Sequence, residues 1–85
     1  MNYKIILAST AEKELYRLHK SEINKIVSAI ESLQTNPRPK GCKKLIGYDG
    51  FYRIRKGNFR IIYSIVDNNH ILNILIIRNR KDAYQ

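Results

Sequence analysis

The chain has 85 residues, of which 44% are hydrophobic, and it carries a formal net charge of +9. This length suits one small domain, expected to span residues 1–85, and the hydrophobic fraction is too high for a disordered chain. The apolar runs are far shorter than the about 20 residues that cross a bilayer, and no secretory signal is visible, so we expect a cytoplasmic protein without a membrane partner. The basic excess taken by itself indicates an anionic partner, which is nucleic acid, an anionic membrane or an acidic protein.

The start of the chain predicts one strand and one helix. Residues 3–7 are expected to form the strand. Ser9 and Glu12 have the spacing of a capping box, in which Ser9 caps the helix and Glu12 reaches back from its first turn. Apolar residues three and four positions apart continue this helix to about His19.

A second helix is predicted after a break near Lys20. Its apolar residues follow the helical spacing, and they are Ile23, Ile26, Val27, Ile30 and Leu33. Pro37 ends the helix, because the residue before a proline is pushed out of the α region. Residues 38–50 are predicted to be a basic loop.

A hairpin is predicted in the next segment. Strands at about 51–56 and 58–66 are joined by Gly57-Asn58, a dipeptide that suits a tight two-residue turn with positive φ. Because side chains alternate between the two faces of a strand, this turn decides which residues share a face.

The two predicted faces of the hairpin differ in their chemistry. Arg55 lies opposite Arg60, and Arg53 points to the same side, which we call the arginine face. Like charges directly opposite each other destabilise a sheet, so this face is expected to receive an anion. The other face collects apolar residues for burial: Tyr52, Ile54, Phe59, Ile61, Tyr63 and Ile65.

A second turn, centred on Asn68-Asn69, leads into a last strand over residues 71–77. The predicted register pairs Tyr63 with Ile74 and Ile61 with Ile76, and it places Ile77 beside Arg60. The chain is therefore predicted to be an α+β domain of order β-α-α-β-β-β. Two N-terminal helices cover one face of a small, mainly antiparallel twisted sheet, and the arginine face stays open.

The arginine face favours phosphate chemistry without a metal. Metal-dependent nucleases need clustered carboxylates to hold Mg²⁺, and none of the seven acidic residues is predicted on this face. Cys42 has no histidine predicted beside it, so we interpret it as structural or incidental. We expect no metal and no cofactor.

Basic residues and a tyrosine follow the last strand, namely Arg78, Arg80, Lys81 and Tyr84. Arginines bind phosphate in a bidentate manner and stabilise extra charge in a transition state. Tyr84 is suited to stacking on a base or to exchanging a proton, and equally to packing as a C-terminal anchor. Metal-free RNA cleavage would use the 2′-hydroxyl of the substrate as nucleophile, so the protein would only orient the phosphate, neutralise charge and shuttle protons.

Short motifs follow one another in order along nearly the whole chain. They are Ala11-x-x-x-Leu15-x-x-Leu18, Leu33-x-x-Asn36-Pro37-Arg38-Pro39, Lys44-Leu45-x-Gly47, Tyr52-Arg53-Ile54-Arg55-x-Gly57-x-Phe59-Arg60-x-x-Tyr63 and Arg80-x-Asp82-x-Tyr84. In order and spacing the chain resembles the RelE/ParE superfamily of toxins from bacterial type II toxin–antitoxin systems. The resemblance implies a RelE-like fold.

For the RelE branch, the resemblance implies a ribosome-dependent mRNA endoribonuclease that cleaves mRNA in the A site by metal-free 2′-hydroxyl attack and inhibits translation. The catalytic residues that it implies are Arg53, Arg55, Arg60, Arg80 and Tyr84. Arg78 takes the place of Arg80 if the tail aligns differently. RNA contacts are expected from Lys43, Lys44, Lys56, Arg78 and Lys81.

Two other functions stay open. ParE-like members of the superfamily inhibit DNA gyrase without nuclease activity, so they would block supercoiling and leave mRNA intact. A basic binding module or a decayed toxin would do neither. The Arg53-x-Arg55 pair, Arg60 and Tyr84 favour the ribonuclease.

Any toxin reading implies a cognate antitoxin. We expect its toxin-binding segment to be acidic or amphipathic, neutralising the basic surface or displacing the tail around Tyr84. The resemblance also implies the ribosome and mRNA as partners, and operator DNA only through the antitoxin complex.

Overall fold

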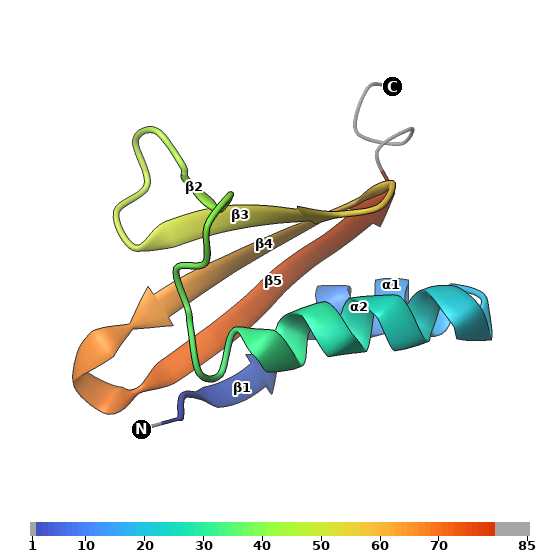
Figure 1. Cartoon of the computed structure of the whole chain (residues 1–85), viewed down its shortest axis with the longest axis horizontal. Helices are drawn as coiled ribbons and strands as arrows, with labels where there is room; N and C mark the ends of the chain where they lie inside the picture. Colours follow the sequence, from blue (N-terminus) through green and yellow to red (C-terminus); the bar gives the residue numbers. More distant parts are fainter. Residues whose placement is uncertain (1, 80–85) are drawn as a thin grey trace.

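The computed structural model describes residues 2–79. A five-stranded mixed sheet in the order β1-β5-β4-β3-β2 carries two helices on one face (Figure 1). The elements are β1 (Lys4–Leu7), α1 (Ser9–Tyr16), α2 (Lys20–Ser32), β2 (Lys43–Lys44), β3 (Phe51–Lys56), β4 (Phe59–Val66), a 3₁₀ turn (Asp67–Asn69) and β5 (Ile71–Asn79). This architecture confirms the predicted α+β fold. Within residues 2–79, no helix has the length and apolar character that a membrane crossing requires.

β1 pairs in parallel with β5, from Lys4 opposite Ile71 to Leu7 opposite Ile74. Parallel neighbours need a long crossover connection, because the chain must return to the same end of the sheet. Here that connection contains both helices and the other strands. This pairing of the first and last described strands makes β1 one edge of the sheet and leaves β2 at the other.

The start of α1 differs from the prediction. Ala8 is the N-cap residue, Ser9 is already helical, and no side chain caps the helix. The predicted capping box is therefore wrong. A tertiary contact ties this end of the helix instead, since Thr10 Oγ1 donates a hydrogen bond of 2.9 Å to the carbonyl of Leu75 in β5.

The glutamate half of a capping box is found one helix later. α1 ends at Tyr16 rather than near His19, and His19 is the N-cap residue of α2. The main-chain N–H of His19 donates a 3.2 Å hydrogen bond to Oε1 of Glu22, the third residue of the helix. In a capping box the side chain at this position accepts the same bond. α2 ends at Ser32, before Pro37 can interrupt it.

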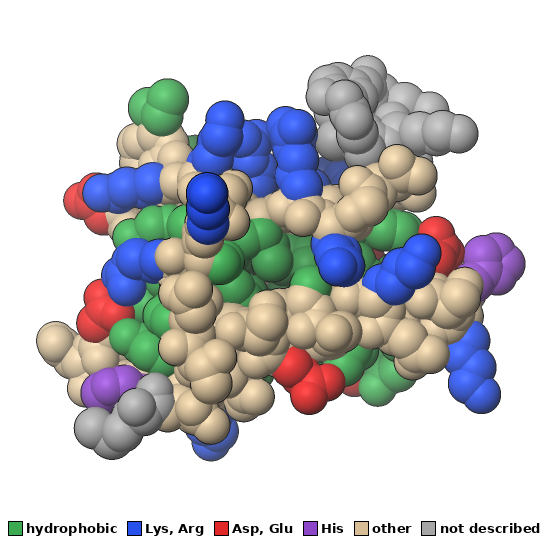
Figure 2. All heavy atoms as spheres, in the orientation of Figure 1, with side chains coloured by type: hydrophobic (Ala, Val, Ile, Leu, Met, Phe, Trp, Pro, Cys, Tyr) green, Lys and Arg blue, Asp and Glu red, His purple; other side chains and the backbone are tan. Residues whose placement is uncertain are grey.

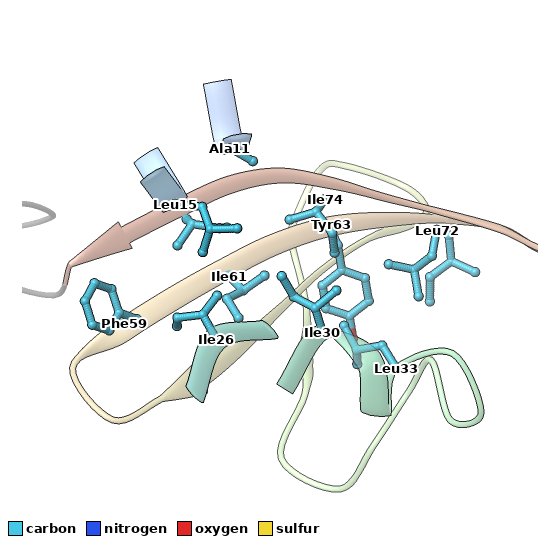
Figure 3. Packing of buried hydrophobic residues seen from close by; sticks show 12 residues of the cluster. Ala11, Leu15, Ile26, Ile30, Leu33, Phe59, Ile61, Tyr63, Leu72 and Ile74 are labelled. Atoms are coloured by element: carbon cyan, nitrogen blue, oxygen red, sulfur yellow. The ribbon is translucent and has the colours of Figure 1, made fainter. Parts of the chain in front are cut away.

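One hydrophobic core fills the space between the helices and the sheet (Figure 3). Its fully buried large side chains are Tyr63, Ile26, Leu33, Ile61, Leu72, Ile74 and Ile77. The predicted apolar face of the hairpin is confirmed, because its β4 members are buried and its β3 members, Tyr52 and Ile54, pack against them. The helices thus cover one face of β3, β4 and β5 and leave the other open.

The β3–β4 hairpin has the predicted register. Arg55 lies opposite Arg60 and Tyr52 opposite Tyr63. Of the two turn residues, Gly57 alone has a positive φ, at 58°. This is the pattern of a type II′ turn, which favours glycine at its first central position and matches the twist of the strands.

The register between β4 and β5 changes at a bulge, which was not predicted. Tyr63 pairs with Ile74 as expected, but Ile62 pairs with Ile76, so Leu75 is an extra residue in β5. The pairs beyond the bulge are Ile61 with Ile77 and Arg60 with Arg78. The predicted pairing of Ile61 with Ile76, and of Ile77 beside Arg60, is therefore wrong by one residue.

The bulge reverses the faces of the end of β5. A shift of one residue moves every following side chain to the opposite face. Ile77 consequently enters the core and Arg78 joins the arginine face. A bulged residue is left unpaired in the ladder of main-chain hydrogen bonds. The carbonyl of the bulged Leu75 instead accepts a hydrogen bond from the side chain of Thr10 in α1.

Candidate functional site

Three arginines lie opposite one another across β3, β4 and β5: Arg55 faces Arg60, and Arg60 faces Arg78. We call them the arginine row. Residues paired in this way share one face of the sheet, and like charges on them repel each other. Arginine forks match the geometry of phosphate oxygens, so an anion over the row would relieve this repulsion.

The charges of the row are largely unneutralised. Among residues 2–79, no carboxylate forms an ion pair with Arg55 or Arg60. Arg78 Nε lies 4.0 Å from Oε2 of Glu14 on α1, so one acidic residue does reach the border of a face where none was predicted. An ion pair this long and this exposed is worth little, and it leaves Arg78 able to bind an anion.

A groove of about 430 Å³ runs along the outer edge of β3, between α2 and the loop before β2. We call it the β3 groove. Its charged lining residues are all basic among the residues described: Lys40, Lys43, Arg53, Arg55 and Lys56. Figure 2 shows Lys and Arg side chains gathered along the upper border of the molecule, over β3. Arg55 belongs to both the groove and the arginine row, so the two sites are continuous.

The loop that forms one wall of the groove is tied to the core. Tyr63 Oη donates a 2.8 Å hydrogen bond to the carbonyl of Pro37. Burial raises the pKa of Tyr63, so its hydroxyl remains a donor over the whole physiological range. The N–H of Cys42 closes the loop on itself by donating to the carbonyl of Pro39 at 3.0 Å.

Arg38 anchors the start of the same loop. Its Nη2 lies 2.8 Å from Oδ2 of Asp67, and its Nε donates to the hydroxyl of Tyr52 at 3.1 Å. Hydrogen bonds from Arg38 and then from Tyr3 lower the pKa of Asp67. The bond to Asp67 in turn raises the pKa of Arg38 above its usual range. Arg38 is therefore a structural cation with a carboxylate partner, unlike Arg55 and Arg60.

The structure brings together most of the predicted site residues that it describes. Arg53, Arg55, Lys43 and Lys56 line the β3 groove, and Arg60 and Arg78 complete the row. Lys44 is separated from them: it pairs with Tyr52, on the core-facing side of the strand, and its Nζ lies 4.0 Å from Asp49. Arg80, Lys81 and Tyr84 lie outside the described residues.

The sequence reasoning missed a strand and the β3 groove. Residues 38–50 were predicted as a loop throughout, but Lys43 and Lys44 form β2, with Lys43 opposite Arg53. A strand of two residues is too short to show an alternating pattern. Lys40 was visible only as one of several loop lysines, and its place in the groove depends on how the loop folds over α2.

The fold and the site define a small basic α+β protein with a row of arginines on the open face of its sheet. The family model for the ParE toxin of the type II toxin–antitoxin system parDE matches residues 5–84. The chain therefore belongs to the RelE/ParE superfamily of toxins from type II toxin–antitoxin systems.

Individual relatives carry RelE names. The chain is 35% identical to a protein of Methanocaldococcus jannaschii named as a candidate RelE1 toxin, over 100% of this chain and 98% of that one. It is similar in structure to the RelE–RelB complex of Pyrococcus horikoshii, with a TM-score of 0.83 and 27% identity, covering 94% and 97% of the two chains. The RelBE2 toxin–antitoxin complex of Mycobacterium tuberculosis gives a TM-score of 0.80 at 25% identity, covering 94% and 100%.

Proposed function

We propose that this toxin is a ribosome-dependent mRNA endoribonuclease that cleaves mRNA in the A site and so inhibits translation. The observation that carries the proposal is the continuity of the arginine row with the β3 groove through Arg55. Together they offer a basic track for the backbone of one RNA strand. The RelE names of the relatives support the same activity.

The reaction needs no metal in this proposal. The 2′-oxygen of a nucleotide attacks the neighbouring phosphorus, a new P–O bond forms, and the bond to the 5′-oxygen of the next nucleotide breaks. The 2′-hydroxyl loses a proton and the leaving 5′-oxygen gains one, which yields a 2′,3′-cyclic phosphate and a 5′-hydroxyl. Extra negative charge develops on the non-bridging phosphate oxygens on the way.

The arginine row is suited to stabilise that charge. Arg55 and Arg60 flank the same spot from adjacent strands and can donate charge-assisted hydrogen bonds to the non-bridging oxygens. A guanidinium keeps its proton in proteins, so these residues act electrostatically. We propose that Tyr84 takes part in proton transfer, and that Arg53 and Arg80 serve as further catalytic cations. Arg78 is proposed to contribute as well, because it faces Arg60.

A defined translation reaction tests this function. Purified protein is added with and without ribosomes, and the 5′ ends of the mRNA fragments are mapped. We expect cuts at codon-phased positions only when ribosomes are present. Arg60→Ala should lower the cleavage rate by about 10²-fold, as the loss of one preorganised donor does. Lys25→Ala, at an exposed position of α2, is the matched control and should cleave normally. Intact mRNA with unaffected translation would rule the function out.

Inhibition of DNA gyrase is the second candidate, because the family model that matches the chain is that of the ParE toxin. A gyrase supercoiling assay with the same preparation distinguishes the two. Inhibited supercoiling with intact mRNA would assign the ParE-like function. Uninhibited supercoiling together with ribosome-dependent cleavage would assign the RelE-like one.

We further propose that the toxin binds a cognate antitoxin, as the relatives from P. horikoshii and M. tuberculosis do in their complexes. Its toxin-binding segment is expected to be acidic or amphipathic and to neutralise the arginine row. Hydrogen exchange of the complex would then show protection of β3 and β4. A basic segment that protects only the helical side would contradict this arrangement.

A further inference from the structure

The free edge of β3 offers main-chain donors beside its cations. β2 pairs only with Tyr52 and Arg53, so the part of β3 nearest the turn has no strand on that side among the described residues. In a two-residue hairpin the pair next to the turn is hydrogen-bonded, and pairs alternate from there. Lys56 and Phe59 form that first pair, so the N–H of Arg55 points away from β4 and towards the β3 groove.

The groove concentrates positive charge that nothing nearby cancels. Its basic lining residues form no ion pair with any carboxylate among residues 2–79. Lys40 and Lys43 approach from the loop wall, while Arg53 and Arg55 approach from β3. The loop wall is held in place by the hydrogen bond from Tyr63 to Pro37. A preformed wall is what a binding site needs, because the cost of ordering it is already met by folding.

The groove borders the arginine row at Arg55, which belongs to both. Adjacent strands of a sheet are about 4.8 Å apart, so a ligand that leaves the row at Arg55 enters the groove within roughly one such step. A ligand that crosses both must present negative charge at each position. The backbone of a nucleic acid does so at every nucleotide, whereas an acidic peptide carries carboxylates only where its sequence places them.

We propose that the β3 groove is a second phosphate subsite, in which Lys40, Lys43 and the main-chain N–H of Arg55 hold the RNA backbone next to the phosphate that is cleaved. The groove also presents Ile54 and Ala29, which give a sugar or base an apolar wall. The inference rests on the proposed function for the identity of the ligand. It makes Lys40 a contact to one particular phosphate instead of a general charge of the loop, and it makes the groove the element that sets the path of the RNA strand.

Binding of an uncleavable RNA tests the subsite without depending on catalysis. The probe is a fluorescein-labelled single-stranded RNA with 2′-O-methyl sugars, which lacks the nucleophile, and anisotropy is measured over a range of salt concentrations. We expect Lys40→Ala and Lys43→Ala each to reduce the slope of log affinity against log salt by about 0.7, the contribution of one phosphate contact to a single strand. Lys40→Arg should restore the slope. Lys4→Ala, on the opposite edge of the sheet, should leave it unchanged.

A dinucleotide probe with a single phosphate separates a subsite from a general charge effect. It can occupy the arginine row without reaching the groove, so its affinity should be the same for the wild type and for Lys40→Ala. Equal losses for the dinucleotide and the longer RNA would overturn the subsite. Unchanged salt slopes for the longer RNA would overturn it too.

The cleavage and binding experiments together test the phosphate subsite and the proposed function separately. Ribosome-dependent cleavage by the wild type, combined with unchanged salt slopes in the lysine variants, removes the subsite and keeps the function. The expected slopes without any cleavage keep the groove as an RNA site and remove the function. A polyglutamate peptide whose binding needs Lys40, while RNA binding does not, would assign the groove to an acidic protein partner and overturn the inference.

Discussion

The covered and open faces of β3, β4 and β5 are built from alternating residues of the same strands, yet one face buries apolar side chains and the other carries facing arginines. On the covered face, Ile61 and Tyr63 are fully buried in a core that includes side chains from both helices and β5 (Figure 3). On the open face, Arg55 and Arg60 are placed opposite each other with no carboxylate partner within residues 2–79.

The residues of one face therefore contribute to the stability of the fold, and those of the other face to its proposed function. Burial of apolar surface stabilises the fold from one face. The arginines on the other face oppose it through like-charge repulsion, and the proposed ligand removes that repulsion. Neighbouring residues in one strand should therefore respond differently to mutation.

The largest expected effect is on the covered face. Ile61→Ala should lower the free energy of unfolding by about 2–5 kcal/mol, because it leaves a cavity in a closely packed core. Its neighbour Arg60→Ala should stay within about 0.5 kcal/mol of the wild type, as surface substitutions usually do. Urea unfolding of both variants measures the difference. Comparable losses for the two would break the proposed division between the faces.

The next effect concerns the bulge that assigns residues to the two faces of β5. Thr10→Val keeps the shape of the side chain but removes the hydrogen bond to the carbonyl of Leu75, so it should cost about 1 kcal/mol. Ser9→Ala is its control. A true N-cap serine would cost about 1 kcal/mol, but Ser9 caps nothing here and should cost nearly nothing. The reverse order in urea unfolding would restore the capping box predicted from the sequence.

A smaller effect of opposite sign is expected on the open face. Arg55→Thr removes one of two facing charges and introduces a good strand former, so it should raise the free energy of unfolding by about 0.5 kcal/mol. The gain should be larger at low salt, where exposed charges interact more strongly. Lys4→Thr on β1 provides the matched strand position away from the row. A loss of stability in Arg55→Thr would show that the row does not carry repulsion.

The smallest expected effect is on the pH dependence of stability, and it comes from Arg38, which has a carboxylate partner in Asp67, unlike Arg55 and Arg60. Because Arg38 lowers the pKa of Asp67, this pair stabilises the fold above the ordinary pKa of the carboxyl. The contribution is lost as the pH falls through the lowered value. The wild type should therefore lose stability more steeply than Asp67→Asn as the pH falls below the ordinary pKa of the carboxyl, about 4. Parallel pH profiles in urea unfolding would show that the Arg38–Asp67 pair contributes nothing.

The parts of the site that lie within one short segment of the chain could be predicted from the sequence, and the parts that depend on distant segments could not. Arg53, Arg55 and Arg60 belong to one hairpin, and a two-residue turn decides their register, so the sequence alone places them on one face. The register at the end of β5, which places Arg78 beside Arg60, was predicted wrongly because it depends on a bulge. The bulged carbonyl of Leu75 accepts a hydrogen bond from Thr10, in a distant part of the chain. The sequence of β5 contains no pattern that predicts the contact between Leu75 and Thr10.

The sequence by itself determined the α+β class, the apolar face of the hairpin and the arginine pair, because the helical and strand periods repeat along the chain and need no distant partner. The tertiary structure decided the parallel pairing of β1 with β5, the third arginine of the row and the β3 groove. Each of these joins segments that are far apart in the chain. Their geometry follows from how the helices, the loop and the sheet pack together, which local periodicity does not encode.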